Sequence, residues 1–512
     1  MLAAVAVDPD PERDRPDPGD HPAGFRGGAA VNPGFVIPTG WSALLPELAL
    51  TGLIGLILIG DVLLKEEAGK ILSGIAVAGL AAVGFLVAAQ WDQPARTVLA
   101  GMFRMDMLAV FFKGIFTIAA LTTVLIARQT PALIRRGLGE FYLLILTATL
   151  GMFLTASAGN LLMLFVALEM ITISFYVMVS YHQEERSLEA GLKYLVLGSI
   201  ASGLFLYGLA FLFGTTGTAD LTEMAAVIQG GLTESPMLVL GLFLVLSSIL
   251  FKSACVPFQL WAPDVYQGAP TPAVAFLSVG SKAAGFVVAL RLLIELLLPL
   301  GGVWIPVVVF LSGATILAGN LGAIPQSNIK RLFGYSTIGH GGYLLIGIAA
   351  GSFLGTQAIL FYLAAYAFTN LAAFLVITAF SKTTGSDEIR DYAGLSRRSP
   401  FLAAMFFLAL LSLAGVPPLA GFFGKFLLIL SAVDAGHGVL AGIGAIAVVI
   451  SLYYYLMIVK TMYADEPADP SPVPVPTTLR IMLWICAAGM LGLGLIQKPL
   501  VNWAAAAAQT LF

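Results

Sequence analysis

Charged residues are scarce in this 512-residue chain, where only 11% of positions are Asp, Glu, Lys or Arg. A soluble domain carries about 25% charged residues. Hydrophobic residues make up 59% of the chain, and the mean hydropathy is +0.93. This composition excludes an ordinary soluble domain and predicts an all-α polytopic membrane protein. The formal net charge of −3 also argues against nucleic-acid binding, which depends on a basic surface.

Motifs that hold metals or nucleotides are absent from the sequence. The two cysteines, Cys255 and Cys486, lie in separate apolar segments and form no CxxC pair. Neither an iron–sulfur cluster nor a zinc site is therefore supported. The sequence contains no Walker A motif and no GxGxxG between a strand and a helix. We therefore predict that this chain holds no cofactor or metal, and that any redox chemistry belongs to partner subunits.

The chain begins with a polar stretch, residues 1–40, that is rich in Pro, Asp and Arg and lacks the apolar core of a signal peptide. We predict that it is a disordered extension. From Trp41 onward the sequence contains fourteen apolar segments of roughly spanning length, about 20 residues each. They lie at 43–64, 71–90, 104–127, 138–157, 159–181, 188–214, 236–262, 271–298, 303–323, 329–350, 355–381, 399–433, 436–463 and 478–497.

Basic residues are distributed unevenly between the loops. Loops after even-numbered segments are nearly free of Lys and Arg, with Arg96 as the main exception. The positive-inside rule therefore places the loops after odd-numbered segments in the cytoplasm and both termini outside. We predict a multi-pass protein of the bacterial inner (cell) membrane. The basic residues in the loops after odd-numbered segments are Lys65, Lys70, Arg128, Arg135, Arg136, Lys330, Arg331, Lys382, Arg390, Arg397 and Arg398.

Five titratable residues lie deep inside apolar segments. At 1.5 Å per residue, Glu169, Lys282 and His340 lie roughly 13 to 16 Å into their segments, near the middle of a bilayer. Ionisable groups at that depth are costly in lipid and usually mark an ion path or pair with one another. We therefore predict a site formed by Glu169, Lys252, Lys282, His340 and Lys425.

Prolines interrupt two of the segments. Pro257 follows Lys252 within the run Leu250–Asp264, and Pro417 begins a Pro-Pro pair within Gly415–Lys425. A broken helix inside a bilayer is tolerated only where protein or a water-filled cavity covers the freed backbone groups. A Val-Pro pair occurs in the seventh segment and again five segments later, which reverses its direction across the membrane. We therefore predict two inverted five-helix repeats with discontinuous helices 7 and 12.

The domain organisation follows from these segments. The first three form a unit over 41–127, and the two predicted repeats cover 138–298 and 303–463. The last segment and the C-terminus occupy 478–512.

Structural explanations remain open for several charged or titratable residues in the apolar segments. Lys113 and Lys193 can snorkel, with their ammonium groups reaching the membrane surface. Arg291 and Glu295 lie one helical turn apart and can form a self-satisfying pair. His340 can be a hydrogen-bonded core histidine. The other four buried charges come from four different segments, two of them interrupted, and packing alone explains them poorly.

Five motifs stand out in the sequence: Gln259–Pro272, Phe276–Lys282, Asn328–His340, Asp391–Leu395 and Ser412–Lys425. They resemble motifs of the antiporter-like membrane subunits of respiratory complex I. The similarity covers roughly residues 100–465, and the motif sequences are most similar to those of the N-type branch, called subunit 2 in chloroplasts and mitochondria. The extension over 1–40 departs from the pattern.

The resemblance implies a proton-translocating membrane-arm subunit of a complex I-type NADH (or related donor):quinone oxidoreductase. Matched by motif, Glu169, Lys252, Lys282 and Lys425 are the charged residues of helices 5, 7, 8 and 12, and Lys425 is on the exit side. His340, with water, would bridge Lys282 and Lys425. NADH, FMN, iron–sulfur clusters and quinone are expected in partner subunits, and the expected neighbours are M-, K-, J- and A-like membrane subunits together with lipid.

Three other functions remain open. The same family includes subunits of multi-subunit sodium/proton antiporters and of membrane-bound hydrogenases, and an antiporter should work without NADH or quinone. An inert scaffold of the membrane arm would instead tolerate loss of the buried lysines.

Overall fold

The structure is a computed structural model that describes residues 40–64, 68–130, 133–134, 137–233 and 235–512. The predicted N-terminal extension therefore lies outside the described residues, except for Gly40. So do Lys65, Arg135 and Arg136, and the side chain of Lys70, on which part of the predicted orientation depends.

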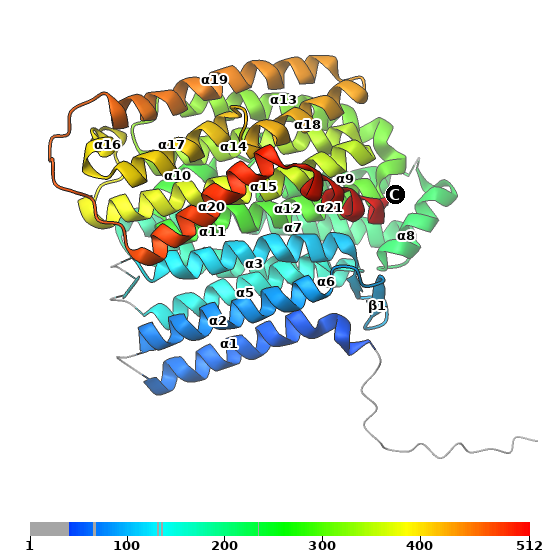
Figure 1. Cartoon of the computed structure of the whole chain (residues 1–512). Coiled ribbons are helices and arrows are strands. Elements are labelled where there is room, and N and C mark those ends of the chain that lie inside the picture. The colour runs from blue at the N-terminus through cyan, green and yellow to red at the C-terminus, as the bar shows by residue number, and fades with distance from the viewer. Residues whose placement is uncertain (1–39, 65–67, 131–132, 135–136, 234) are drawn as a thin grey trace, which may run out of the picture. The chain divides into compact units, whose positions relative to one another are not determined.

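Helices form almost all of the described secondary structure, as the composition predicts (Figure 1). Up to residue 268 the helices are α1 Leu45–Leu64, α2 Ala68–Ala89, α3 Met107–Ala127, α5 Leu138–Ala156, α6 Leu161–Ser180, α7 Glu185–Thr216, α8 Leu221–Val227, the π-helix η3 Ile228–Leu232, α9 Pro236–Lys252 and α10 Trp261–Gly268. Short 3-10 helices, η1 Trp41–Leu44 among them, adjoin several of the α-helices.

The later helices begin with a segment that alternates between α- and π-helix: α11 Thr271–Phe276, η4 Leu277–Ser281, α12 Lys282–Ala289 and η5 Leu290–Leu296. They continue with α13 Gly301–Ala323, α14 Ile329–Ala350, α15 Phe353–Thr384, α16 Leu395–Arg398, α17 Pro400–Ala414, α18 Ala420–Asp434, α19 Gly438–Tyr463, α20 Thr477–Leu495 and α21 Lys498–Ala508. One feature was missed from the sequence. The strands β1 Arg96–Val98 and β2 Phe103–Met105 pair antiparallel just before α3.

Eleven of the described helices are long and apolar enough to cross a membrane. All fourteen apolar segments of the sequence are helical over most of their length. Three predicted segments are not among the eleven helices. Two of them are interrupted, as α9–α10 and as α17–α18, and the third is α14. The number of fourteen and the inverted repeats therefore stay predictions, whereas an all-α, multi-pass membrane fold is confirmed.

Polar residues fix where several helices begin. Asn160 accepts a hydrogen bond from the backbone N–H of Met163 at the start of α6, and Asn328 accepts one from Arg331 at the start of α14. Such N-caps satisfy backbone donors that have no partner within the helix. They set the register of α6 and α14, and with it the depth of the titratable groups on these helices.

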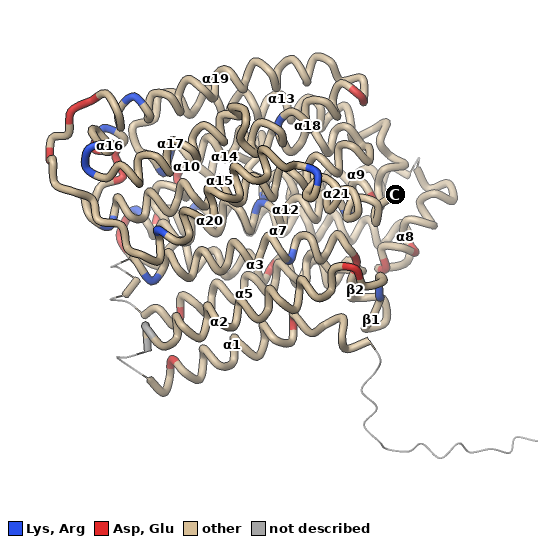
Figure 2. Tube along the Cα trace, viewed as in Figure 1, with Lys and Arg blue, Asp and Glu red and all other residues tan. Residues whose placement is uncertain are grey.

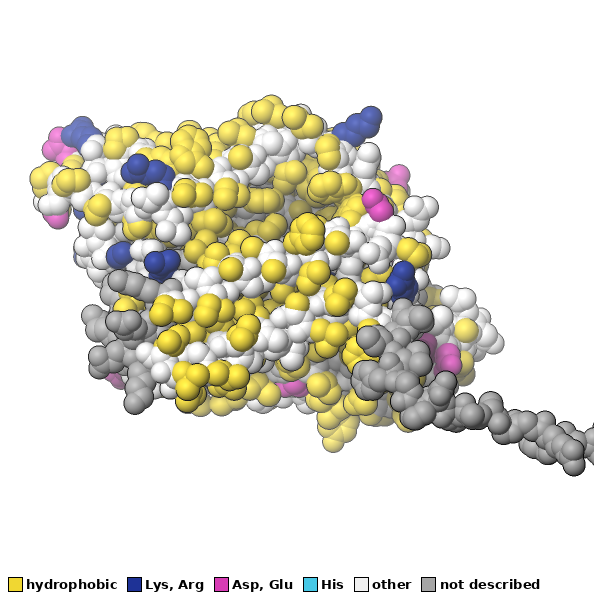
Figure 3. All heavy atoms as spheres, turned by 60° about the horizontal axis from the view of Figure 1, so that its bottom comes forward, with side chains coloured by type: hydrophobic (Ala, Val, Ile, Leu, Met, Phe, Trp, Pro, Cys, Tyr) yellow, Lys and Arg dark blue, Asp and Glu magenta, His cyan; other side chains and the backbone are white. Residues whose placement is uncertain are grey.

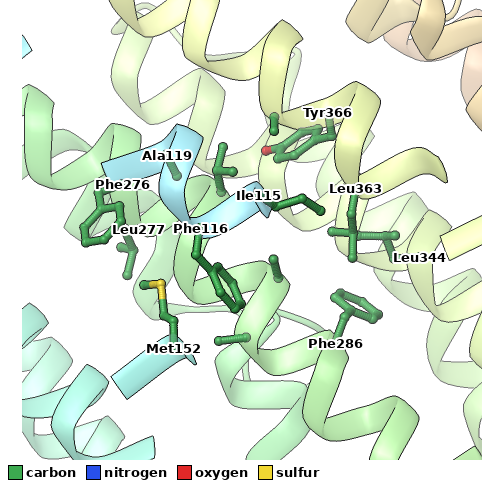
Figure 4. Close-up of a cluster of buried hydrophobic side chains, with 14 of the residues drawn as sticks. Ile115, Phe116, Ala119, Met152, Phe276, Leu277, Phe286, Leu344, Leu363 and Tyr366 are labelled. Atoms are coloured by element: carbon green, nitrogen blue, oxygen red, sulfur yellow. The ribbon is translucent and has the colours of Figure 1, made fainter. Parts of the chain in front are cut away.

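The core of the bundle lies around two helical spans. The spans Thr271–Leu296 and Phe353–Thr384 are 100% and 94% buried over their most apolar windows, whereas α1 is only 22% buried. Figure 4 shows side chains from α3, α5, α12 and α15 meeting in this core, among them Phe116, Met152 and Phe286. Because lipid is itself apolar, packing and polar contacts hold such helices together more than burial from water does.

Glycine permits a close helix contact between α13 and α14. A Cβ on Gly319 would lie 2.2 Å from the backbone nitrogen of Gly339, and one on Gly342 would lie 2.6 Å from that of Ile316. Only small residues allow backbones to approach this closely. The contact fixes α14 in place, and α14 carries His340.

Charges and apolar surface are separated on the molecule. Figure 2 shows Lys and Arg gathered at the end of the bundle that carries α16. Figure 3 shows hydrophobic side chains across the forward face, with charged side chains mainly toward its two ends. An apolar belt between polar ends is the surface expected of a protein embedded in lipid or packed against other membrane subunits.

Candidate functional site

Both predicted helix breaks are present. α9 ends at Lys252 and α10 begins at Trp261, while α17 ends at Ala414 and α18 begins at Ala420. The indole N–H of Trp261 donates to the carbonyl of Phe251 over 3.1 Å, which satisfies an acceptor at the first break. The Nζ of Lys425 donates to the carbonyl of Ala414 over 3.2 Å, across the second break. Side chains thus donate hydrogen bonds to backbone carbonyls at both interruptions.

At one end of the site, hydroxyl groups bind the two opposite charges. The half-buried carboxylate of Glu169 on α6 accepts a hydrogen bond of 2.6 Å from the Ser202 hydroxyl on α7. The ammonium of Lys252 donates to the hydroxyl of Thr172, which lies one turn after Glu169 on α6. Lys252 and Glu169 also attract each other electrostatically. Thr172 is the group that Lys252 contacts, which places Lys252 one helical turn from Glu169 along α6.

The middle of the site is formed around Lys282, which directly follows the π-helix η4. Its Nζ donates to the carbonyl of Thr337 over 2.6 Å and to the Thr337 hydroxyl over 3.2 Å, and lies 4.9 Å from the ring centroid of Tyr366. The Thr337 hydroxyl also bonds to the hydroxyls of Tyr266 and Tyr366 over 3.0 and 2.9 Å. π-Helical turns recur at functional sites, and here one positions a buried lysine.

Helix α14 connects Lys282 to Lys425. Thr337, His340 and Tyr343 are spaced three residues apart, so they follow one another along one side of the helix. Thr337 contacts Lys282, and the ring centroid of Tyr343 lies 4.8 Å from the Nζ of Lys425. His340 therefore lies between the two lysines. The contacts along α14 thus place Lys282, His340 and Lys425 near one another.

Both ring nitrogens of His340 have a tyrosine partner. Nδ1 lies 2.5 Å from the hydroxyl of Tyr362, and Nε2 lies 3.3 Å from that of Tyr455. The Tyr455 hydroxyl also bonds to Ser336 over 2.6 Å. A hydrogen-bonded core histidine is therefore consistent with the structure, and so is a histidine held within a hydrogen-bonded chain.

Sequence reasoning missed the hydroxyl groups that link the predicted charges. Apolar helices of membrane proteins carry many Thr and Tyr residues, so their presence alone predicts nothing. The spacing of Thr337 and Tyr343, one turn on either side of His340, is the signal that could have found two of them. The missed groups are Thr172, Ser202, Tyr266, Thr337, Tyr343, Tyr362, Tyr366 and Tyr455.

A second buried charge pair lies outside this row. The ammonium of Lys113 on α3 lies 2.6 Å from the carboxylate of Glu47 on α1, with side chains 0% and 5% exposed. It also lies 5.0 Å from the ring centroid of Phe103. Snorkelling of Lys113 is therefore wrong, because its charge is neutralised inside the protein. Lys193 does extend outward, with its side chain 43% exposed and paired with Glu189 and Asp264.

Arg291 and Glu295 form the expected pair, at 3.2 Å, within a larger network. Arg291 also lies 2.8 Å from Asp106, the residue before α3, and Arg104 lies 2.6 Å from Glu295. Burial alone would raise the pKa of Asp106, but the guanidinium groups of Arg291 and Arg104 hold it below its ordinary value. This network ties the β-hairpin and the start of α3 to the end of η5.

A polar cavity of about 700 Å³ opens where α14 begins and α15 ends. Its lining includes Lys330, Thr378 and Lys382, and Lys330 pairs with Asp387 over 3.0 Å. Among the described residues, no group of three or more His, Cys, Asp or Glu side chains could hold a metal ion.

Comparison with known proteins identifies the family. Residues 158–451 match the family described as NADH:quinone oxidoreductase/Mrp antiporter, TM. The chain is also 41% identical over 473 residues to the NADH-quinone oxidoreductase subunit N of Moorella thermoacetica, covering 92% of this chain and 98% of that protein. The chain belongs to the NADH:quinone oxidoreductase/Mrp antiporter family. The resemblance seen in the sequence is thereby confirmed.

Other known proteins are also similar to most of this chain. The chain is 41% identical over 433 residues to the NAD(P)H-quinone oxidoreductase subunit 2 of Acaryochloris marina, covering 84% of this chain and 83% of that protein. A chain of respiratory complex I from Thermus thermophilus with bound aureothin superposes with a TM-score of 0.77 at 32% identity, covering 90% and 99% of the two chains. A chain of the Mrp complex from Dietzia shares the fold alone, with a TM-score of 0.79 at 22% identity, covering 92% and 97%.

Proposed function

We propose that this chain is a proton-translocating membrane-arm subunit of a complex I-type NADH (or related donor):quinone oxidoreductase. The observation that carries the proposal is the row of buried charges and hydroxyls from Glu169, through Lys252, Lys282 and His340, to Lys425. Relatives named as subunit N or subunit 2 of quinone oxidoreductases support this assignment over the antiporter and hydrogenase alternatives.

The charges suggest how protons move. A nearby carboxylate favours the protonated form of an amine, so Glu169 would hold a proton on Lys252. When that attraction weakens, Lys252 releases its proton toward Lys282. The proton then passes from Lys282 to Lys425 by way of His340 and its tyrosine partners. Because each transfer needs groups within hydrogen-bond reach, the hydroxyls of Thr337 and Tyr362 are the steps between the larger side chains.

Proton uptake is assigned to the polar cavity near the start of α14. Thr378 on α15 lines that cavity, and two turns earlier on the same helix the amide of Asn370 donates to the Ser278 hydroxyl over 2.5 Å. Ser278 lies one turn before Lys282. This series of polar groups supports entry of protons toward Lys282 from the end of the bundle that carries α16.

The energy for pumping must come from neighbouring subunits in this proposal. NADH, FMN, iron–sulfur clusters and quinone would be bound there, and M-, K-, J- and A-like subunits are the proposed neighbours. The proposed location is the bacterial cell membrane, with the loops after odd-numbered spans in the cytoplasm.

Expression of the chain alone in vesicles should give no NADH oxidation and no quinone-coupled proton pumping, because its sequence contains no redox or nucleotide motif. Dye-based proton uptake and NADH absorbance measure the two activities, and vesicles with the intact complex are the positive control. Robust sodium/proton exchange by the chain alone would contradict the proposal and favour the antiporter function.

The proposed topology is tested by a reporter enzyme fused after Phe512. The fourteen-span topology puts this end outside the cytoplasm, so alkaline phosphatase fused there should be active. A fusion within the loop between α15 and α16 is the matched control and should be inactive. An inactive fusion after Phe512 would mean that one span has been miscounted.

A further inference from the structure

The break after Lys252 contains a buried hydroxyl that the described relay does not use. Ser253 is 0% exposed, and its Oγ has no hydrogen-bond partner among the residues that the structure describes. Most buried polar groups are paired, and leaving one unpaired is destabilising. An unpaired hydroxyl at this buried position, just after the end of α9, therefore calls for an explanation.

One side of this hydroxyl faces the helix of Lys282. A Cβ added to Gly285 on α12 would lie 3.1 Å from the Ser253 Oγ and 3.3 Å from the Cβ of Lys252. Gly285 lies three residues after Lys282, on the same side of the helix. The Ser253 hydroxyl thus adjoins Lys252 along the chain and the Lys282 side of α12 through space.

The other side of the break packs against α14. A Cβ on Gly341, the residue after His340, would lie 2.8 Å from the Ser253 carbonyl oxygen and 3.1 Å from the Cys255 Sγ. Ala254 adopts a φ of 55°, a left-handed conformation that is costly for a residue other than glycine and that clusters at functional sites. The two glycines therefore let this segment pack closely between α12 and α14, and Ala254 within it adopts a strained conformation.

We propose that the Ser253 hydroxyl passes protons between Lys252 and Lys282; this inference rests on the proposed function. A hydroxyl has one donor and two acceptor positions. The protonated Lys252 gives one proton to the Ser253 Oγ, directly or across one water. The original O–H proton passes to the neutral amine of Lys282. The hydroxyl is regenerated, one proton has moved from one lysine to the other, and no electron is transferred.

Two variants of Ser253 in the intact complex test this assignment. Ser253→Ala removes the hydroxyl, while Ser253→Cys roughly keeps its volume and replaces it with a weak donor. Both should lower donor-driven proton pumping per assembled complex roughly tenfold, as loss of one hydrogen bond to a charged group would. Both should also raise the ratio of rates in H2O and D2O, because proton transfer across the break becomes slower.

The matched control is Ser247→Ala, on α9, the helix that ends just before Ser253. The Ser247 hydroxyl donates to the carbonyl of Phe243 in its own helix over 2.8 Å, so its loss should leave pumping and the isotope ratio unchanged. If Ser253→Ala does not assemble, Ser253→Cys alone decides the test.

The outcomes separate this inference from the proposed function. Wild-type pumping in the Ser253 variants overturns the inference, and so does normal pumping in Ser253→Cys alone, because space filling would then explain the serine. An isotope ratio that stays at the wild-type value overturns it as well. If Lys252→Ala pumps normally in the same membranes, the relay itself is wrong. If Lys252→Ala fails and the Ser253 variants pump normally, only the role of Ser253 is wrong.

Discussion

Lys252→Ala should reduce donor-driven proton pumping and the coupled quinone reductase rate together, by roughly the 10²-fold that loss of a proton-transfer group costs. The variant removes the titratable group that contacts Thr172 and attracts Glu169. The helix break itself should persist, because Pro257 and the hydrogen bond from Trp261 to Phe251 are unchanged. The measurement is proton uptake in membranes, normalised to assembled complex.

Lys252→Arg separates proton transfer from charge and packing. Arginine keeps the positive charge and approximate size but does not release its proton in proteins, so this variant should fail as Lys252→Ala does. Glu169→Gln should act in the same direction, since it removes the charge that favours the protonated lysine. Lys193→Ala is the matched control, because that partly exposed lysine forms only surface ion pairs. Wild-type pumping in Lys252→Arg would contradict the relay and leave a structural role.

Local features of the fold were predictable because their signals are continuous in the sequence. The eighth predicted segment, 271–298, corresponds to Thr271–Leu296. The breaks near Pro257 and Pro417 were predictable for the same reason, since proline acts on its own turn. Replacement of α-helix by π-helix on either side of Lys282 has no such signal, because it arises from packing in the most buried span.

Partners across the bundle were not predictable in this way. Lys252 contacts Thr172, and Lys282 contacts Thr337, although many residues separate each pair in the sequence. The charges themselves stood out against an apolar background, so the lysines were found. The hydroxyls did not stand out, because Thr and Tyr are common in these helices.

Lys113 shows that the position of a charged residue along an apolar segment does not by itself predict its environment. Its position near the start of α3 is compatible with snorkelling, and the sequence does not show whether another helix brings a carboxylate to it. Glu47 on α1 does so, and the two side chains are buried together. Mutation of Lys113 is therefore expected to destabilise the protein severely, whereas mutation of a snorkelling lysine would have a minor effect.

Lys113→Ala should destabilise the subunit strongly, because it leaves the Glu47 carboxylate buried without its partner. Breaking a buried ion pair by removing one member costs about 3–5 kcal/mol. We expect less assembled complex in membranes and a lower unfolding temperature of the purified complex. Thermal unfolding of the complex in detergent measures the effect, with Lys193→Ala as a control that removes a partly exposed lysine.

The double variant Glu47→Met with Lys113→Met should recover most of that loss. It removes both charges while approximately keeping the volumes of the side chains, and replacing a complete buried pair is often nearly neutral. Because this pair lies outside the row from Glu169 to Lys425, the double variant should also pump normally per assembled complex. A double variant as unstable as Lys113→Ala would show that the lysine matters for its packing against Phe103. Normal stability in Lys113→Ala would show that the pair contributes nothing to holding α1 against α3.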